Sequence, residues 1–407
     1  MSAAPTPPMG WNSFDCYGSS VTEAEVLAEA TAMAPLRAHG WDHVVVDYQW
    51  YDPSPNPLGW QHAPAFAMDA HGRLQPAEDR FPCAAGGRGF APLAQRVHAL
   101  GLKFGFHILR GIPRAAVARD CRLPNGHALA EIADPASTCA WNPDMVGVRP
   151  DHPAAQAWYD AIVGQYATWG CDYLKLDDAS HPFHAAEVAL VRRAIDRCGR
   201  AITLSLSPGP APIGRAAELR ALAECWRISA DYWDTWDELK RQFELCAAWA
   251  PHGGDGRWAD ADMLPLGHLA IRNPEHGLGE RDTRLSRDEQ TALMTLWVIA
   301  RSPLMMGGSF ARLDPWTRAL LSNDEALAPL KRGRDPRETA RDGVRRVWRS
   351  TSGDGAWLAL FNLGDEPTRF SDLADTTTVR DCWQRRDVRF AEVAEVAAHG
   401  ARLLRLR

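Results

Sequence analysis

Short apolar runs alternate with longer amphipathic runs through the first three quarters of the chain. The apolar runs occupy residues 9–13, 43–47, 103–107, 173–177, 201–205, 225–229, 258–263 and 303–306. Runs of this length that are rich in β-branched and aromatic residues are typical of buried parallel strands. Helical spacing follows or separates them at residues 21–39, 90–101, 154–170, 185–198, 216–224, 236–249 and 288–300. About eight strand–helix units in succession predict a (β/α)8 barrel.

Two of the predicted helices carry clear start signals. Thr22 is followed three residues later by Glu25, which is the pattern of a capping box, and Ser286 precedes the helix expected at 288–300. Two long segments, at 51–89 and 108–150, show no regular pattern. Loops of that length inside a compact domain are usually functional, so we expect them to contribute to a site.

The pattern changes near residues 331–341, a charged and polar stretch. After it come short strand-like segments with turn signals between them and no long helices. The candidate strands are residues 345–349, 356–362, 368–370, 377–381 and 401–406. We therefore expect a barrel domain at residues 1–330 and a small antiparallel β-sandwich at residues 331–407.

Composition narrows the class of protein. The chain has 407 residues, of which 24% are charged, and a net charge of −6. It lacks a basic run and an apolar run of about 18 residues, so neither nucleic acid nor a membrane is expected as a partner. The N-terminus shows no charged region followed by an apolar one, so no signal peptide is expected. That leaves a cytoplasmic protein, or one whose leader has been removed.

The nine cysteines lack C-x-x-C spacing, which argues against a zinc site. Cys121 and Cys139 flank one loop and could form a bridge, but free thiols are expected. The 17 tryptophans are unusual, and several stand beside polar residues at predicted strand ends, where they could serve as platforms for sugar rings or simply fill the core. These are Trp11, Trp50, Trp141, Trp226 and Trp258.

The predicted strand at 173–177 has the sequence Y-L-K-L-D, with a cation and an acid at its carboxyl end. A buried strand accommodates Lys175 and Asp177 only if they pair with each other or face a site. In a parallel barrel the carboxyl ends of the strands form the floor of the active site. There, the ammonium of Lys175 would keep the Asp177 carboxylate ionised, as a nucleophile requires. A strand-end salt bridge is the alternative, and the functional acid could also be the adjacent Asp178.

Polar residues end most of the other predicted strands as well. Together with the pair above they are Trp11, Asp47, His107, Lys175, Asp177, Ser207, Arg227, Asp231 and Asp262. The chain has no H-E-x-x-H, G-x-G-x-x-G, P-loop or G-x-S-x-G motif, so we expect neither a metal nor a nucleotide cofactor nor a serine nucleophile. Paired carboxylates remain, and their commonest use is glycoside hydrolysis.

Seven motifs in a fixed order carry a resemblance to a known family. They are P-P-M-G-W-N-S at 7–13, V-V-V-D-Y-Q-W at 44–50, D-Y-L-K-L-D at 172–177, C-W-R-I-S-A-D at 225–231, W-A-D-A-D-M-L at 258–264, L-W-V-I-A-R-S-P-L-M-M-G at 296–307 and L-S-N-D-E-A-L-A at 321–328. Together they resemble the α-galactosidase or melibiase-like glycosidases of glycoside hydrolase family 27. The resemblance implies a (β/α)8 barrel, a C-terminal β-sandwich, no metal and retention of anomeric configuration.

The resemblance also assigns roles to residues. It implies that Asp177 is the nucleophile and Asp231 the general acid and then base, with Asp234 as a weaker candidate for the acid. Asp231 must carry a proton at the first step, which partial burial and the negative charge of Asp177 would favour. Retention requires the two carboxylates to lie about 5–5.5 Å apart. The resemblance further places Lys175, Arg227, Asp47, Trp11 and Asp262 around the sugar.

The sequence departs from the family pattern at the end of the second strand. Many members have D-D-C-W there, whereas this chain has Asp47-Tyr48-Gln49-Trp50. The second acid, which binds sugar hydroxyls, is Tyr48. The cysteine is Gln49 and its usual partner is Ser19, so both halves of a family disulfide are missing. His107 stands where a tyrosine is common, and the fifth strand ends in Ser207 rather than in a C-E-W type of sequence.

These departures leave the catalytic pair in place and alter the predicted sugar pocket. Loss of a carboxylate removes a strong acceptor for the axial 4-hydroxyl of galactose, and such hydrogen bonds discriminate strongly between sugars. The favoured hypothesis is a retaining exo-α-glycosidase, most simply an α-galactosidase acting on an α-linked oligo- or polysaccharide. The alternatives are the same machinery with another glycone, as in isomalto-dextranase, α-glucosidic or β-L-arabinopyranosidase activity, and a sugar-binding barrel without turnover.

Overall fold

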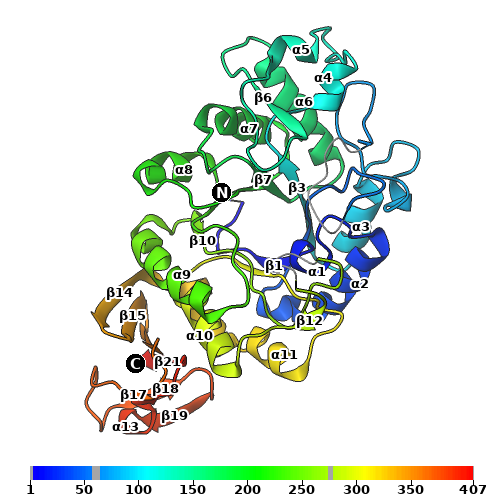
Figure 1. The fold of residues 1–407 in the computed structure, drawn as a ribbon. Coiled ribbons are helices and arrows are strands. Elements are labelled where there is room, and N and C mark those ends of the chain that lie inside the picture. Colours follow the sequence, from blue (N-terminus) through cyan, green and yellow to red (C-terminus); the bar gives the residue numbers. More distant parts are fainter. Residues whose placement is uncertain (1–2, 57–64, 274–277, 407) are drawn as a thin grey trace.

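The computed structural model describes residues 3–56, 65–273 and 278–406 (Figure 1). Part of the long loop predicted at 51–89, namely residues 57–64, therefore lies outside the described residues. So do the ends of the two domains predicted from the sequence, residues 1–2 and 407.

Eight parallel strands form one sheet in which neighbours along the chain are neighbours in space. They are β1 (Met9–Asn12), β2 (His43–Val46), β3 (Lys103–Leu109), β7 (Tyr173–Asp177), β8 (Thr203–Leu206), β9 (Cys225–Arg227), β10 (Trp258–Asp260) and β13 (Leu304–Met306). Strand β1 also pairs with β13, and a parallel bridge between Leu264 and Met306 joins the two ends of the sheet. The sheet is thus closed, and the predicted (β/α)8 barrel is confirmed.

Helices surround this sheet as a ring, which Figure 1 shows around the strands. The longer ones are α2 (Glu23–Met33), α3 (Ala91–Ala99), α6 (Ala155–Thr168), α7 (Ala185–Arg197), α8 (Ala216–Leu222), α9 (Trp236–Trp249), α10 (Arg287–Ala300), α11 (Pro315–Leu321) and α12 (Asp324–Arg332). The start signals read from the sequence are real, because Thr22 and Ser286 both form capping boxes. The helix expected at 21–39 ends as a 3-10 turn, Ala34–His39, because a proline follows its first residue.

The segment predicted as a loop at 108–150 contains a small structure of its own. It holds β4 (Ile112–Pro113), α4 (Arg114–Ala118), α5 (Leu129–Ile132), β5 (Ala133–Asp134) and β6 (Met145–Val148), with the strands in the antiparallel order β4-β6-β5. Elements of two to five residues are too short to show a sequence period, which is why they were read as loop.

The C-terminal part is antiparallel and packs beside α9 and α10 in Figure 1. Its main sheet has the order β14 (Arg334–Asp342), β15 (Arg345–Ser352), β16 (Gly355–Asn362), β21 (Ala401–Leu406), β18 (Thr378–Asp381), β19 (Arg386–Arg389), and a second sheet pairs β17 (Thr368–Arg369) with β20 (Glu395–Val396). Most of the charged stretch at 331–341 forms edge strand β14. Edge strands that carry charge and proline resist unwanted pairing, which explains the polar pattern.

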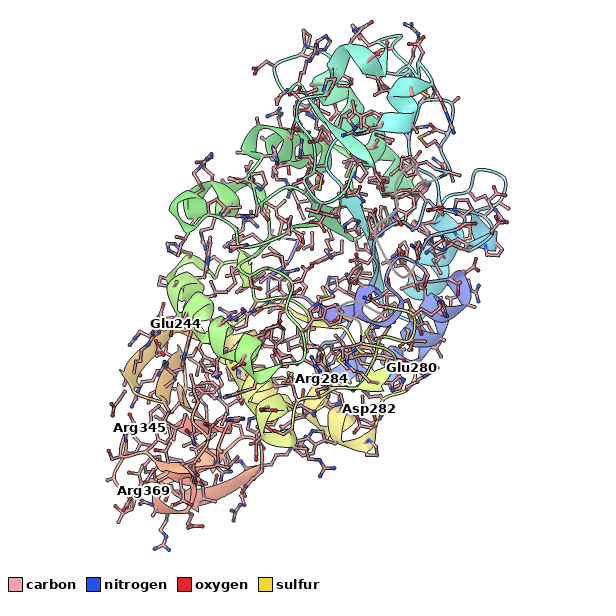
Figure 2. All side chains as sticks on the ribbon, in the orientation of Figure 1. Glu244, Glu280, Asp282, Arg284, Arg345 and Arg369 are labelled. Atoms are coloured by element: carbon pink, nitrogen blue, oxygen red, sulfur yellow. The ribbon has the colours of Figure 1, made fainter. Side chains whose placement is uncertain are left out.

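Ion pairs join this domain to the barrel. Arg341 of β14 and Arg346 of β15 both reach Glu244 of α9, which Figure 2 labels beside these strands. Because Arg341 and Glu244 are exposed to solvent, the pairs add modestly to the junction, and apolar packing supplies the rest. Trp348, Trp357 and Phe361 of the sheet belong to the same apolar core cluster as the barrel.

The interior is unusually aromatic. Trp11, Trp50, Trp226 and Trp258 are at most 1% exposed, so four of the five candidate sugar platforms fill the core. Trp141 is only partly buried. All nine cysteines are free, including Cys121 and Cys139. Among the described residues, no helix combines the length and the apolar character needed to cross a bilayer.

Candidate active site

A cavity of about 240 Å³ lies at the carboxyl ends of the barrel strands. Residues named from the sequence line it: Asp47, Tyr48, His107, Lys175, Asp177, Arg227, Asp231 and Asp262. Further lining comes from Phe14, Asp15, Trp141, Pro208, Gly209, Ala230, Tyr232, Trp233 and Met263. Closure of the barrel brings together lining residues that are up to 249 positions apart in the chain, from Phe14 to Met263.

Asp177 ends β7 at the floor of this cavity, with 12% of its side-chain surface exposed. One carboxylate oxygen accepts a hydrogen bond from Nε2 of His107 at 3.0 Å, and the other accepts from the backbone N–H of Asp178 at 2.9 Å. Burial pushes the pKa of Asp177 upward, but the hydrogen bond from His107 and the charges of His107 and Lys175 outweigh it, so the pKa is lowered. Asp177 is therefore a carboxylate at neutral pH.

The ammonium of Lys175 pairs directly with Asp47 rather than with Asp177. Its Nζ lies 2.8 Å from Oδ2 of Asp47, which also accepts a hydrogen bond from Asn12 at 2.7 Å. Burial alone would lower the pKa of Lys175, but the charges of Asp47 and then Asp177 raise it. The strand-end salt bridge considered as an alternative thus exists, but with Asp47 as the acid. Lys175 acts on Asp177 through the electrostatic attraction of its positive charge.

Asp231 follows β9 and stands at the open side of the cavity. Its side chain is 58% exposed, and Oδ1 lies 3.1 Å from Nη2 of Arg227. The expected partial burial of Asp231 is wrong for this structure, because the loop after β9 presents the carboxyl group to solvent. The two acids therefore differ sharply in their surroundings, since Asp177 is enclosed and Asp231 is open to water.

Arg227 also holds a second, buried acid. Oδ2 of Asp262 lies 2.7 Å from Arg227 Nη2 and accepts a hydrogen bond from the backbone N–H of Tyr232 at 2.7 Å. Burial raises the pKa of Asp262 to about 7, with Arg227 opposing and the charges of Asp231 and Asp260 adding to the rise. Asp262 lines the cavity, but its hydrogen bonds place it primarily as a support for Arg227 and for the loop that carries Asp231.

The alternative acids lie elsewhere. Asp178 turns away from the cavity and pairs with Arg110 at 2.7 Å. Asp234 is completely buried and pairs with Arg281 at 2.6 Å and with Arg284, labelled in Figure 2, at 3.3 Å. An acid neutralised in this way has a structural role, so the geometry favours Asp177 and Asp231 over these two.

Two residues predicted to contact the sugar do not line the cavity. Trp11 is fully buried and packs edge-on against Tyr17, with ring centroids 6.2 Å apart. Ser207 lines a separate, small cavity of about 20 Å³ beneath the site, which it shares with Lys175 and Asp260. A polar space of that size holds about one water molecule. The strand-end pattern and the resemblance predicted both residues to contact the sugar. Neither signal distinguishes a residue that lines the cavity from one that packs behind the lining residues.

Aromatic residues of the rim were missed or left open by the sequence analysis. Trp233, two residues after Asp231, lines the cavity, and Trp141 reaches it from the segment between β5 and β6. The sequence D-Y-W, which begins with the predicted acid Asp231, was the available signal for Trp233. For Trp141 the sequence offered only one tryptophan among many. Among the described residues, no three His, Cys, Asp or Glu side chains gather as metal ligands.

Comparison with known proteins shows the family of the chain. A family model described as "Alpha galactosidase A" matches residues 145–331, and one described as "Alpha galactosidase C-terminal beta sandwich domain" matches residues 342–406. The chain is 44% identical to a β-L-arabinopyranosidase of glycoside hydrolase family 27 from Geobacillus stearothermophilus, over 99% of this chain and 97% of that one, with a TM-score of 0.95.

The chain belongs to glycoside hydrolase family 27. It is also 26% identical to α-galactosidase 3 of Arabidopsis thaliana, over 95% of this chain and 77% of that protein. Human α-galactosidase A is 26% identical over 88% of this chain and 74% of its own length. The protein is thus a glycoside hydrolase, and the family resemblance read from the seven motifs is confirmed.

Proposed function

We propose that the protein is a retaining, exo-acting glycosidase for the galacto-configured ring, with α-galactosidase activity as the family's common form. One observation carries the proposal: two acids of unlike surroundings, Asp177 and Asp231, line a single cavity at the carboxyl end of the barrel. The enclosed acid suits a nucleophile beneath the sugar. The exposed acid suits a group that must meet the leaving group and then water.

In the first step, the carboxylate of Asp177 attacks the anomeric carbon while Asp231 gives its proton to the glycosidic oxygen. The C–O bond to the leaving group breaks, and a glycosyl ester of Asp177 forms. His107 and Lys175 stabilise the charge on Asp177 before attack and in the transition states. In the second step, Asp231 takes a proton from water, which attacks the anomeric carbon and releases Asp177. Two inversions give retention.

The size of the cavity supports action at a chain end. Its volume of about 240 Å³ is below the ~300–1,000 Å³ of sites for drug-sized ligands, so it suits a single sugar ring. Asp47 and Lys175 form a buried pair on its floor that can accept from and donate to sugar hydroxyls. Trp141 and Trp233 offer apolar surface for a ring.

The proposal is tested by initial rates on p-nitrophenyl α-D-galactoside, β-L-arabinopyranoside, α-D-glucoside and N-acetyl-α-D-galactosaminide, with dextran alongside. NMR of the first-formed sugar then reports the anomer. We expect turnover of a galacto-configured glycoside with the anomer retained. Hydrolysis of the α-glucoside or dextran alone, or an inverted product, would contradict the proposal.

Replacing His107 with phenylalanine is expected to move the acid limb of the kcat/KM profile to higher pH. The active form of Asp177 is the carboxylate, and the His107 hydrogen bond is the leading influence that lowers its pKa against burial. Without that bond the pKa of Asp177 rises, so activity is lost at a higher pH as pH falls. His98→Phe is the control, since His98 forms a similar pair with Asp172 (2.7 Å) away from the cavity. An acid limb shifted equally in both variants, or in neither, would refute this role.

A second candidate activity is β-L-arabinopyranosidase, and Tyr48 is the observation that favours it. β-L-Arabinopyranose has the ring configuration of α-D-galactopyranose from C1 to C4 and lacks only the hydroxymethyl group on C5. Tyr48 lines the cavity where many family members have a second acid, and its ring is far larger than an aspartate side chain. A wall of that size leaves less space for a substituent on the sugar. The 44% identical Geobacillus stearothermophilus protein is a β-L-arabinopyranosidase.

Exchanging Tyr48 for aspartate is expected to shift selectivity toward the galactoside. The smaller side chain opens space in the cavity and restores an acceptor for sugar hydroxyls. We expect the ratio of kcat/KM for α-D-galactoside to that for β-L-arabinopyranoside to rise at least about fivefold, since one such polar contact is worth roughly 1–3 kcal/mol. The ratio is measured with p-nitrophenyl glycosides. A ratio that stays constant or falls would show that Tyr48 does not limit the glycone.

A further inference from the structure

Behind the cavity lies a buried carboxylate held by neutral donors. Asp144 is 2% exposed, and the hydrogen-bond donors to its carboxylate among the described residues are neutral hydroxyl and amide groups. Its Oδ2 accepts hydrogen bonds from Tyr48 at 2.9 Å, Tyr51 at 3.2 Å and Gln49 at 3.3 Å. All three bonds fall on Oδ2, while Oδ1 has no hydrogen-bond partner among the described residues. Because a buried carboxylate is costly, Asp144 depends on the three donors of this cluster.

The cluster fixes the hydroxyl group of Tyr48 from two sides. The hydroxyl donates to Asp144 and accepts a short hydrogen bond from the side-chain amide of Asn142. Asn142 is 1% exposed, and its Oδ1 accepts from the backbone N–H of Asp144 at 2.8 Å, which ties the two partners to each other. Both lie in the segment that leads into β6, about 95 positions from Tyr48.

The ring of Tyr48 faces the other way, toward the catalytic acid. It packs edge-on against His107, with centroids 5.6 Å apart and planes at 84°, and His107 is the residue that hydrogen-bonds Asp177. The hydroxyl end of Tyr48 is thus anchored in the cluster while its ring lines the cavity. Tyr51, by contrast, donates to the same oxygen of Asp144 but does not line the cavity.

We infer that Asp144, with Asn142, is a positioning residue that holds the Tyr48 ring as a fixed wall of the sugar subsite and so limits which substituent on C5 can enter. The inference rests on the proposed galacto-configured substrate. A phenol held by two buried hydrogen bonds has one orientation, whereas a ring held only by packing can tilt. A fixed wall favours the glycone that lacks a hydroxymethyl group. Glycone choice would then depend on two residues, Asn142 and Asp144, that do not line the cavity.

The test compares selectivity in single-atom and matched variants. Tyr48→Phe removes the anchored hydroxyl and keeps the ring. Tyr51→Phe removes a hydroxyl from the same Asp144 oxygen without touching the cavity. We expect Tyr48→Phe to raise the galactoside-to-arabinopyranoside ratio of kcat/KM about fivefold, the equivalent of about one hydrogen bond. Tyr51→Phe should leave the ratio within about twofold, although both variants lose thermal stability.

Variants of Asp144 complete a double-mutant cycle. Asp144→Leu should shift the ratio as Tyr48→Phe does, whereas Asp144→Asn, which keeps an acceptor oxygen, should shift it less. In the Tyr48→Phe background, Asp144→Leu should leave the ratio unchanged, because Asp144 acts through the missing hydroxyl. If Asp144→Leu fails to fold, Asn142→Leu replaces it in the cycle.

A Tyr48→Phe ratio within about twofold of the wild-type ratio would overturn the inference, as would an equal shift in Tyr51→Phe. If the wild-type protein hydrolyses neither glycoside, the proposed function fails separately. The effect of the Tyr48 ring on glycone choice is then measured as the ratio of the calorimetric dissociation constants of D-galactose and L-arabinose in the same variants. An unchanged ratio of those constants would overturn the positioning role.

Discussion

The Asp177→Ala variant should fold normally and lose turnover by about 10⁴-fold or more in kcat, the scale seen when a catalytic nucleophile is removed. That factor corresponds to about 5.5 kcal/mol of lost transition-state stabilisation. The reason is structural: Asp177 is an enclosed, ionised carboxylate at the cavity floor, and two neighbouring acids are paired with cations. Asp178 is held by Arg110 and Asp47 by Lys175. Steady-state rates on an activated aryl glycoside measure the loss, and circular dichroism checks the fold.

Azide separates the roles of the two acids. In Asp177→Ala, azide can attack the anomeric carbon in place of the carboxylate and yield a glycosyl azide of inverted configuration. In Asp231→Ala, the glycosyl ester still forms with a good leaving group, and azide then releases a product of retained configuration. The same azide anomer from both variants, or near-normal turnover by Asp177→Ala, would show that the roles are assigned wrongly.

Asp178→Asn is a matched control for the nucleophile. Its side chain is one position along the chain but pairs with Arg110, which also pairs with Glu187, and it does not line the cavity. We expect it to lose stability because the buried guanidinium is left partly unpaired. The variant should keep most of its kcat. The difference in kcat between Asp177→Ala and Asp178→Asn decides which of the two adjacent aspartates is the nucleophile.

The fold could be predicted from the sequence because each barrel strand is a short and strongly apolar run of residues. H-V-V-V at 43–46 and Y-L-K-L-D at 173–177 are too apolar for a surface position and too short for a helix. The acids and cations at their ends then fall at one rim by topology alone. Register between strands is different, since it depends on pairs far apart in the chain. The sequence therefore gave no signal that Lys175 meets Asp47, 128 positions away.

The solvent exposure of the site residues was predicted less well than which residues form the site. Asp231 was expected to be partly buried because its chemistry calls for a proton, yet the loop that carries it leaves it open. Asp144 stood in a segment read as a loop without regular structure, where a buried carboxylate has no periodic signature. Its partners Tyr48 and Gln49 were noticed only as departures from a family pattern. Departures of this kind mark where new contacts have replaced old ones.

A buried arginine takes the place of the missing family disulfide. Arg80 is 6% exposed and donates to the backbone carbonyl of Ser19 at 2.6 Å and of Gln49 at 2.7 Å. These are the two positions at which the resemblance to the family implies cysteines. It also donates to the carbonyls of Val21 at 2.8 Å and Asp52 at 2.9 Å. A planar guanidinium with five donors can serve four carbonyls at once, whereas a lysine cannot.

Substituting methionine for Arg80 should therefore lower the free energy of unfolding by about 2–4 kcal/mol, because buried carbonyls from the loops after β1 and β2 lose their donors. Removal of a buried charge offsets part of that loss. Burial lowers the pKa of Arg80 to about 10, so the group remains charged at neutral pH. Thermal and urea unfolding, followed by tryptophan fluorescence, measure the change. Arg80→Lys should be intermediate.

Arg96→Met is the control, since Arg96 is 58% exposed and forms a single surface pair with Glu23 at 2.9 Å. That variant should lose less than about 1 kcal/mol. Because Asp47 and Tyr48 immediately precede Gln49, loosening this cross-link should also raise KM for the glycoside more than it lowers kcat. Equal stability losses in the two variants would mean that solvent readily satisfies the four carbonyls and that Arg80 does not replace the disulfide.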